Sequence, residues 1–402
     1  MKTEIITDNV GAAAEIIKGG GVAAVPTETV YGLAANGLDA DAVKKLYEIK
    51  GRPEVKPISL LVSGPGEIER LCRDVPPQAE TLAEKFWPGP LTIVLASKAE
   101  VPEIVRAGGD TVGLRCPDHP LTLKLLRKAD VPLAAPSANP SGESSPISAR
   151  QVLDYFDGKI DAVVDGGECS VGHESTVFDM SAAPYRVLRR GALPEGEIAA
   201  ALAEKMMLVG ITGGSGCGKT TALGVLENMG ALVIDCDGVY HALCRESAEM
   251  KDEICAQFGG VCGEDGLDRK KLGAVVFSDP DALARLNDIT HRYVYARVEE
   301  LLRAHAMSGG TLAAIDAIAL IEGDFAKRTA FNVAVTAPEE ARVRRLAARE
   351  GISEEYARLR IAAQHECDYF IKNCDYALEN DGDIDAFRNK CEKFFTEVLR
   401  NA

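Results

Sequence analysis

Residues 210–221 read GITGGSGCGKTT, and this stretch constrains the fold more than any other part of the 402-residue chain. It fits the pattern G-x-x-x-x-G-K-[ST], a glycine-rich loop that connects a buried strand to the start of a helix. The residues just before it, MMLVGI, are apolar without alternation, as a strand of a parallel sheet requires. The residues that follow, TTALGVLENMG, carry apolar side chains at helical spacing and end in glycine. The sequence therefore predicts an α/β fold with a parallel sheet in the second half of the chain.

A loop of this kind binds phosphate. Its glycines let backbone N–H groups surround phosphate oxygens, the following helix presents its positive end, and the lysine reaches the β- and γ-phosphates. We therefore expect ATP as the phosphoryl donor, with Mg²⁺ held by the hydroxyl of Thr220 and with Lys219 taking part in catalysis. A chance glycine turn is the alternative. The predicted ATP-binding residues are Gly213, Gly214, Gly216, Cys217, Gly218, Lys219, Thr220 and Thr221.

Two aspartates follow the next apolar segment, ALVID. Asp235 and Asp237 are expected at the carboxyl end of a parallel strand, where ligands bind in open α/β sheets. On an extended segment, residues two apart point the same way. Either carboxylate could therefore hold Mg²⁺ or accept a proton from a substrate hydroxyl, and ordinary loop capping is the alternative.

Arginines concentrate in residues 342–360. Guanidinium groups suit phosphate oxygens and the charge of a transferring phosphoryl group. A surface helix held by i,i+4 ion pairs is the alternative, and both interpretations can hold for different arginines. Arg345 and Arg349 are the predicted catalytic arginines and Arg360 a predicted ATP ligand, whereas His291 is as easily a packing residue as a site residue. The six arginines are Arg342, Arg344, Arg345, Arg349, Arg358 and Arg360.

Five ordered motifs make residues 207–400 resemble the dephospho-CoA kinases. They are GITGGSGCGKTT, VIDCD, LNDITH, RLAAREGISEEYARLRIAAQ and CDYALENDG. The resemblance implies ATP-dependent phosphorylation of the ribose 3′-hydroxyl of dephospho-CoA. It implies that Asp237 is the base, which leaves Asp235 as the metal ligand, and that the arginine-rich segment is a lid over ATP. The chain departs from the family at Arg292, where proline is usual, and at IALIEGDF, which keeps Glu322 but lacks a proline.

The first half has no such loop, but it has a cationic turn. Val43, Leu46 and Tyr47 fit an amphipathic helix that runs into Lys50, Arg52 and Lys56. Three positive charges within seven residues would hold a triphosphate or pyrophosphate electrostatically. A solvated helix end is the alternative.

Three polar runs, each joined to an apolar strand, accompany the cationic turn. They are PLAAPSANPSGESSP at 132–146, GHESTVFD at 172–179 and VLRRGAL at 187–193, and DTVGLRCPDHP precedes them at 110–120. Such runs normally form turns. Their recurrence after strands instead suggests hydroxyls and backbone amides lining one cavity.

Together with PTETVYGL and KGRP, these runs make residues 8–200 resemble the YrdC family, the L-threonylcarbamoyladenylate synthases. The resemblance implies a twisted α/β fold with a large cationic cavity in which L-threonine, bicarbonate and ATP form threonylcarbamoyl-AMP and pyrophosphate. The product would pass through tRNA-modifying partner proteins to tRNA. The implied threonine-binding residues are Thr29, Arg115, Ala135 and Ser175. The implied ATP-binding residues are Lys50, Arg52, Lys56, Thr111, Ser137, Asn139, Ser145 and Arg189.

The chain thus divides near residue 205, into a YrdC-like synthase domain at 1–205 and a kinase domain at 206–402, joined by a short helix within PEGEIAAALAEK. A bifunctional enzyme is the leading hypothesis. One alternative makes the first half a non-catalytic RNA-binding or scaffolding module, for which the cationic cavity would permit weak RNA binding. Another keeps the kinase but changes its acceptor to a nucleoside or another small alcohol.

Composition agrees with a globular protein. The net charge of −16 argues against a general nucleic-acid-coating or anionic-membrane surface, and no apolar run approaches the roughly 20 residues that span a bilayer. The N-terminus has acids where a signal peptide needs an apolar stretch. The eleven cysteines form no CxxC pair, so we expect reduced, buried thiols and a cytoplasmic protein.

Overall fold

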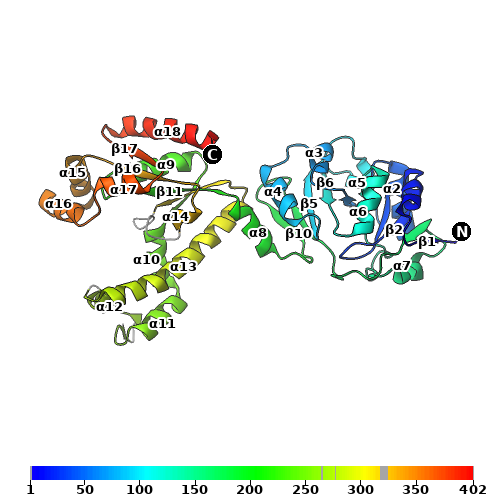
Figure 1. The fold of residues 1–402 in the computed structure, drawn as a ribbon, viewed down its shortest axis with the longest axis horizontal. Helices are drawn as coiled ribbons and strands as arrows, with labels where there is room; N and C mark the ends of the chain where they lie inside the picture. The colour runs from blue at the N-terminus through cyan, green and yellow to red at the C-terminus, as the bar shows by residue number, and fades with distance from the viewer. Residues whose placement is uncertain (1, 264–265, 277, 317–324, 402) are drawn as a thin grey trace. The chain divides into compact units, whose positions relative to one another are not determined.

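The computed structural model describes residues 2–263, 266–276, 278–316 and 325–401 (Figure 1). The chain forms two compact units, one from Met1–Glu204 with Met307–Gly309 and one from Lys205–Ala306 with Gly310–Ala402. Helix α8 (Glu195–Glu204) ends the continuous part of the first unit, and strand β11 (Met207–Thr212) begins three residues later. Each unit mixes helices with a sheet, which confirms the predicted α/β class.

The first unit is built on a ten-stranded mixed sheet. Some neighbouring strands pair parallel, as β5 (Leu91–Ala96) does with β9 (Thr176–Asp179), and others antiparallel, as β5 does with β6 (Thr111–Arg115). In spatial order the strands are β1 (Glu4–Ile6), β8 (Ala162–Val164), β2 (Ala23–Val25), β3 (Gly32–Asn36), β7 (Leu133–Ala134), β4 (Leu60–Leu61), β6 (Thr111–Arg115), β5 (Leu91–Ala96), β9 (Thr176–Asp179) and β10 (Arg186–Arg189).

Helices cover this sheet and close its core. Apolar faces of α1 (Val10–Lys18) and α6 (Pro120–Ala129) pack on β1, β2, β3 and β8, where residues such as Ile17 and Leu125 are fully buried. Helix α2 confirms the predicted amphipathic segment; Asp39 caps its first turn by accepting from the N–H groups of Asp41 and Ala42, and Gly51 ends it. The remaining bounds are α2 (Ala40–Lys50), α3 (Glu67–Leu71), α4 (Pro77–Phe86), α5 (Glu103–Arg106) and α7 (Ala149–Phe156).

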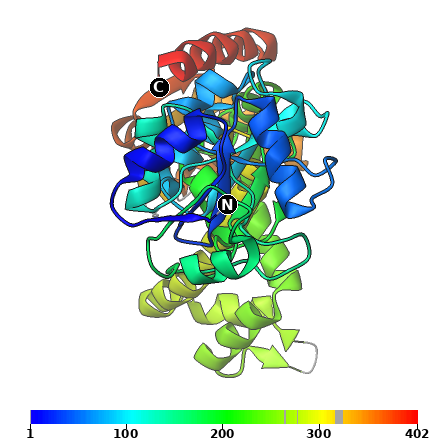
Figure 2. The same ribbon diagram turned by 90° about the vertical axis from the view of Figure 1, so that its right-hand side faces the viewer.

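The second unit contains a five-stranded sheet in which every pair is parallel. Its order is β12 (Leu232–Asp235), β15 (Leu312–Asp316), β11, β16 (Phe331–Thr336) and β17 (Tyr376–Glu379). Helices α9 (Lys219–Asn228) and α18 (Ile384–Asn401, red in Figure 2) pack on it through residues such as Leu226 and Phe395. The predicted strand, glycine-rich loop and helix are all present, as β11, residues 213–218 and α9. The strand is apolar without alternation because a strand inside such a sheet is buried on both faces.

Two helical groups flank the parallel sheet. Helices α11 (Ala248–Gln257), α12 (Arg269–Val276) and α13 (Pro280–Met307) share a small apolar core of their own, to which Met250, Ile254 and Leu286 belong. The arginine-rich segment forms α15 (Glu339–Glu350) and α16 (Glu354–Ala362), which lie together at one end of the sheet (Figure 1). The shorter elements are α10 (Cys236–Glu246), β13 (Cys262–Gly263), β14 (Gly266–Leu267), α14 (Phe325–Arg328) and α17 (Cys367–Asn373).

The expectation that every cysteine is a reduced thiol is wrong for one pair. Cys255 of α11 and Cys262 of β13 form a disulfide, because the chain turns back on itself after α11 and brings their Cα atoms to 5.7 Å. The other nine cysteines are free, and five of them are buried. Among the residues that the structure describes, no helix is long and apolar enough to cross a membrane.

Candidate active sites

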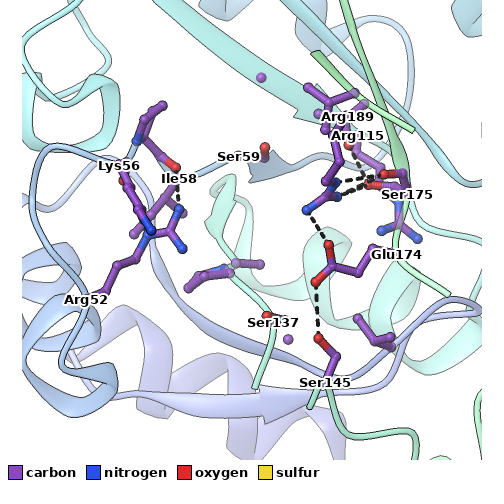
Figure 3. Close-up of a pocket in the computed structure, with 18 of the residues that line it drawn as sticks. Arg52, Lys56, Ile58, Ser59, Arg115, Ser137, Ser145, Glu174, Ser175 and Arg189 are labelled. Carbon is purple, nitrogen blue, oxygen red and sulfur yellow. Dashed lines mark hydrogen bonds and ion pairs between the residues drawn. The ribbon is translucent and has the colours of Figure 1, made fainter. Parts of the chain in front are cut away.

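A cavity of about 540 Å³ opens in the first unit (Figure 3). The end of α2, strands β6, β9 and β10, and the segment after β7 all contribute to its lining. Eleven of the twelve residues predicted for this half line it: Lys50, Arg52, Lys56, Thr111, Arg115, Ala135, Ser137, Asn139, Ser145, Ser175 and Arg189. The twelfth, Thr29, is fully buried and accepts a hydrogen bond from Arg115 at 2.9 Å. The polar runs therefore meet at one place, as their recurrence after strands indicates.

Arg52 and Lys56 occupy one wall of the cavity (Figure 3). Arg52 stabilises the turn in which it lies by donating to the carbonyl oxygens of Lys56, at 3.3 Å, and Pro57, at 3.0 Å. Tyr47 of α2 fixes the same turn by donating to the Lys56 carbonyl at 2.8 Å. Among the described residues, the Lys56 ammonium has neither a hydrogen bond nor an ion pair. It is thus available to an anion.

Lys50 differs from these two cations because it is buried, with 3% exposure. Its ammonium donates to the carbonyl oxygens of Ser137 and Asn139, which ties the end of α2 to the serine-rich segment. Burial and, to a smaller extent, the charge of Arg52 lower the pKa of Lys50 to about 8, while Glu174 acts in the opposite direction. Lys50 is therefore not the solvated charge at a helix end that the alternative interpretation supposed.

Arg115 is buried at the base of the cavity in an ion pair that the sequence did not reveal. Its Nη2 donates to Glu28 Oε1 at 2.7 Å and to Thr29 Oγ1 at 2.9 Å, and its Nε donates to the Gly89 carbonyl at 3.2 Å. Burial lowers the pKa of Arg115 and Glu28 raises it. Two of its three nitrogens are thus engaged within the described protein, and Nη1 is the one left for a ligand.

Hydroxyl groups form two short chains beside Arg115. Thr27 and Thr29 lie 2.9 Å apart through their Oγ1 atoms, and the Thr27 hydroxyl donates to the Val30 carbonyl at 2.7 Å. Thr92 of β5 and Ser175 share a hydrogen bond of 2.9 Å. These bonds fix the hydroxyls at the cavity base, and Thr27 and Thr92 join the lining as residues that the sequence motifs did not single out.

Arg189 and Glu174 face each other on the wall opposite Arg52 (Figure 3). Arg189 donates from Nε and Nη2 to the Ser175 carbonyl, at 3.1 and 2.9 Å, and its Nη1 lies 2.6 Å from Glu174 Oε2. Glu174 Oε1 accepts from the Ser145 hydroxyl at 3.1 Å. Glu174 was missed although it stands within the EST motif, because an acid is not an obvious lining for an anion site.

In the second unit, the glycine-rich loop lies at the end of β11. Gly213 has φ +141°, and a Cβ there would collide with the Val335 carbonyl, so only glycine fits. Lys219 begins α9, donates to the Gly213 carbonyl at 3.1 Å and lies 3.9 Å from Asp316 Oδ1. Burial raises the pKa of Asp316 to about 6, and Lys219 acts in the opposite direction. Asp316 is a missed candidate, and the apolar strand LAAID that it ends was its signal.

A clamp formed by Gln364 and Arg342 holds the tip of this loop. Gln364 accepts from the Ser215 N–H at 2.8 Å and donates to the Ser215 hydroxyl at 2.7 Å. Arg342 donates to the Ser215 carbonyl at 3.0 Å and to Gln364 Oε1 at 3.1 Å. Sequence reasoning placed Arg342 in the lid but did not select it.

Of the three selected lid arginines, only Arg345 reaches the loop in this structure. Its Nη2 donates to Asn380 Oδ1 at 3.0 Å, and Asn380 in turn donates to the Cys217 carbonyl at 2.9 Å. Arg349 and Arg360 instead both pair with Glu350, the first within α15 and the second between α16 and α15, and neither is an i,i+4 pair of the kind that the alternative supposed. Their predicted site roles stay untested.

The two aspartates after β12 are not on one extended segment, so that expectation is wrong. Asp235 ends the strand and caps α10 by accepting from the Asp237 N–H at 3.0 Å, whereas Asp237 lies in the first helical turn. Both are exposed, as are Thr220 and His291. Among the described residues, no group of three or more His, Cys, Asp or Glu side chains could hold a metal ion. Glu322 lies outside the described residues.

Comparisons with known proteins match the two halves to different families. Residues 15–191 match the Sua5–YciO–YrdC family model, described as telomere recombination. Residues 207–386 match the model described as dephospho-CoA kinase.

Curated relatives follow the same division. A threonylcarbamoyl-AMP synthase of Pyrococcus abyssi is 47% identical over 192 residues, which are 48% of this chain and 56% of that protein. The chain thus spans about half the length of this relative. A shorter relative from Methanocaldococcus jannaschii, provisionally given the same name, is 38% identical over 42% of this chain and 78% of its own. A dephospho-CoA kinase of Aquifex aeolicus is 33% identical over 49% of this chain and 100% of its own.

Proposed function

The chain belongs to the Sua5–YciO–YrdC family through its first half and to the dephospho-CoA kinase family through its second, and from this premise we propose that it is a bifunctional enzyme. The first unit would condense L-threonine, bicarbonate and ATP into threonylcarbamoyl-AMP and pyrophosphate. The second would transfer the γ-phosphoryl group of ATP to the ribose 3′-hydroxyl of dephospho-CoA. The observation that supports this most directly is the gathering of cations and hydroxyls around one cavity of the first unit, remote in sequence from the glycine-rich loop of the second.

The proposed synthase reaction needs placement of anions rather than a side-chain nucleophile. The threonine amine captures CO₂ as a carbamate, and a carbamate oxygen attacks the α-phosphorus of ATP and releases pyrophosphate. The protein must hold two anions together, offset their charge and exclude water from a labile product. Arg115, at the buried base, is suited to the threonine carboxylate. Arg52 and Lys56 on one wall and Arg189 on the other are suited to the phosphates (Figure 3).

In the proposed kinase reaction, the glycine-rich loop and Lys219 bind the ATP phosphates. Arg345 contacts the loop through the Gly216 carbonyl, at 3.5 Å, and is placed to offset charge on the transferring group. Asp237 is the proposed base for the acceptor hydroxyl. It is exposed in the first turn of α10 and has no fixed side-chain partner among the described residues, so it is accessible to an acceptor.

Residues around Lys219 suit a Mg²⁺ ion. Asp235 and Asp316 are register partners on adjacent parallel strands, and Asp316 lies beside the lysine that would bind phosphate. Carboxylates and a hydroxyl are the ligands that this ion prefers, usually completed by substrate phosphates and water. We propose that Asp316 and Thr220 hold it, with Asp235 next to them. When bound, Mg²⁺ would neutralise charge on the β- and γ-phosphate oxygens.

The transfer of the product to other proteins and the location of the enzyme complete the proposal. We propose that threonylcarbamoyl-AMP passes to tRNA-modifying partner proteins, and that the enzyme works in the cytoplasm with small-molecule substrates in both units. The two family matches support this.

The test is a pair of assays on the purified full chain. Pyrophosphate release from ATP should depend on both threonine and bicarbonate, and ADP formation should depend on dephospho-CoA. A first unit that binds ATP and RNA but releases no pyrophosphate would favour the non-catalytic module. ADP formation with a nucleoside but not with dephospho-CoA would favour a different acceptor.

A further inference from the structure

The cavity of the first unit contains an acid where anionic phosphates are proposed to bind. Glu174 lies between Arg189 and Ser145, 2.6 Å from the Arg189 guanidinium and 3.1 Å from the Ser145 hydroxyl. Both partners are predicted ATP ligands. A fixed carboxylate at this place would repel a triphosphate, so its presence needs a physical explanation.

The contacts of Arg189 show what Glu174 occupies. Arg189 uses Nε and Nη2 on the carbonyl and hydroxyl of Ser175, which fixes the guanidinium plane. Its Nη1 is the remaining nitrogen, and that nitrogen pairs with Glu174. The two Glu174 oxygens therefore contact the two donors, a guanidinium and a hydroxyl, from which two phosphate oxygens would accept hydrogen bonds.

The charge of Glu174 also reaches the opposite wall. Burial lowers the pKa of both Lys50 and Arg52, and in each case the negative charge of Glu174 acts in the opposite direction. In the described cavity, Glu174 thus offsets mutual repulsion among cations that belong to both walls.

The side chain of Glu174 can leave this position although its backbone cannot. The Ala192 N–H donates to the Glu174 carbonyl at 2.9 Å, and a Cβ on Gly191 would collide with the backbone of Glu174 and Ser175. The side chain itself is 36% exposed. Release of Arg189 and Ser145 would therefore need only a change of side-chain rotamer, which exposed residues undergo within nanoseconds.

We propose that Glu174 is a positioning residue that holds the groups a phosphate would contact and is displaced when the nucleotide binds. It keeps Arg189 and Ser145 aligned before ATP arrives, and it weakens the binding of any phosphate ligand too poor in contacts to displace it. This inference rests on the proposed synthase function, since that function assigns the nucleotide to this cavity.

The test is calorimetric titration of the full chain with inorganic tripolyphosphate, which needs no turnover. Lys219→Ala is included in every variant to weaken binding at the other unit. Glu174→Gln keeps the size of the side chain and removes the competing charge. Glu143→Gln is the matched control, because Glu143 lines the same cavity and is exposed but forms no ion pair among the described residues. We expect Glu174→Gln to lower the dissociation constant about two- to fivefold, the size of a partly exposed ion pair, and Glu143→Gln to lower it less.

Tighter binding is a result that simple structural damage would not produce. If Glu174→Gln does not fold, as judged by its melting temperature, Glu174→Asp serves instead. Aspartate keeps the charge but is too short to span both partners, so binding should again tighten. Equal effects of the two glutamine variants, or an unchanged or higher dissociation constant for Glu174→Gln, would overturn the proposal. Weakening seen only with Mg²⁺ present would place Glu174 on the cation and also overturn it. A wild-type chain that releases no pyrophosphate would instead count against the proposed function alone.

Discussion

At the scale of single residues, the buried cations Arg115 and Lys50 of the first unit are each stabilised by hydrogen bonds to a carboxylate or to backbone carbonyl oxygens. Arg115 has Glu28, and Lys50 has two backbone carbonyls. An unpaired buried charge would cost several kcal/mol or lose its ionisation. The pairs therefore let cations sit inside the cavity wall, where an anionic ligand meets them with little competing water.

Arg115→Lys should weaken threonine binding while leaving ATP binding near wild type. Lysine keeps the charge and can still pair with Glu28, but it loses the guanidinium nitrogen Nη1 that the protein leaves for a ligand. The loss of one charge-assisted hydrogen bond corresponds to roughly 1.5–3 kcal/mol, or about 10- to 150-fold in affinity. The Michaelis constants for threonine and ATP in pyrophosphate release measure this. An unchanged threonine constant would remove Arg115 from the threonine site, and a changed ATP constant would move it to the nucleotide.

Phosphate binding at the cavity should weaken as the pH rises through about 8. Burial lowers the pKa of Lys50 to about 8, so its positive charge is lost above that pH. Lysine titrates near 10.4 when unfolded, so folding favours the neutral amine. This group's unfavourable contribution to stability is therefore relieved as the pH rises from about 8 towards 10. Tripolyphosphate affinity in the Lys219→Ala chain should fall by up to about fivefold between pH 8 and 9, because the protonated fraction of Lys50 falls by that factor.

The control for this pH effect is Lys50→Met, which is neutral at every pH. Its affinity should be lower at pH 7 and should not show the decline near pH 8. A decline of the same size in both proteins would mean that another group titrates. Lys50 would then act only through its hydrogen bonds to the carbonyl oxygens of Ser137 and Asn139.

At the scale of elements, both candidate sites lie where strands end, and in both a neighbouring helix or segment stabilises the loop that forms the site through hydrogen bonds. In the second unit, Gln364 follows α16 and Arg342 lies on α15, and both hold Ser215 at the tip of the glycine-rich loop. Hydrogen bonds therefore connect α15 and the residues after α16 to the glycine-rich loop. Movement of the pair on ATP binding would have to exchange these contacts for contacts with phosphate.

The disulfide between α11 and β13 predicts the thiol content of the protein. Of eleven cysteines, two are paired and nine are free. Protein that is denatured and alkylated during lysis without a reductant should therefore take up nine equivalents of the alkylating reagent, and protein that is reduced before alkylation should take up eleven. Replacing Cys255 and Cys262 together by serine should make the two counts equal at nine. Eleven reactive thiols in unreduced protein would show that the pair is reduced, as the sequence suggested.

At the scale of the whole molecule, each unit has its own core and its own candidate phosphate site. The core of the first unit is formed by residues such as Ile17 and Leu125, and that of the second by residues such as Leu226 and Phe395. Side-chain substitutions at distant, independent sites usually act additively. The two activities should therefore be separable by single substitutions within one chain.

Lys219→Ala should abolish phosphorylation of dephospho-CoA and leave threonine-dependent pyrophosphate release near wild type. Lys56→Ala should do the reverse, lowering pyrophosphate release through a higher Michaelis constant for ATP. Both assays on both variants, with melting temperatures to confirm folding, give the comparison. Loss of both activities in a folded variant would contradict the assignment of one ATP site to each unit.

The sequence by itself determined the features that depend on local order. Apolar runs without alternation predicted β11 and β12, helical spacing predicted α2 and α9, and glycine spacing predicted the phosphate loop, because each depends on neighbours along the chain. The resemblance that the motifs of the first half carry also predicted which residues would gather at the cavity, and eleven of those twelve line it.

Tertiary structure alone decided which polar or charged side chain contacts which partner. Glu28 pairs with Arg115 across 87 positions, and Gln364 holds Ser215 across 149, separations at which no local pattern specifies a partner. The expectation that Asp237 lies on an extended segment was wrong because Asp235 caps α10, which begins at Cys236 and places Asp237 in its first turn. Glu174 was overlooked because an acid is not an obvious lining for an anion site, and its partners Arg189 and Ser145 reach it only when β9, β10 and the segment after β7 come together in the folded sheet.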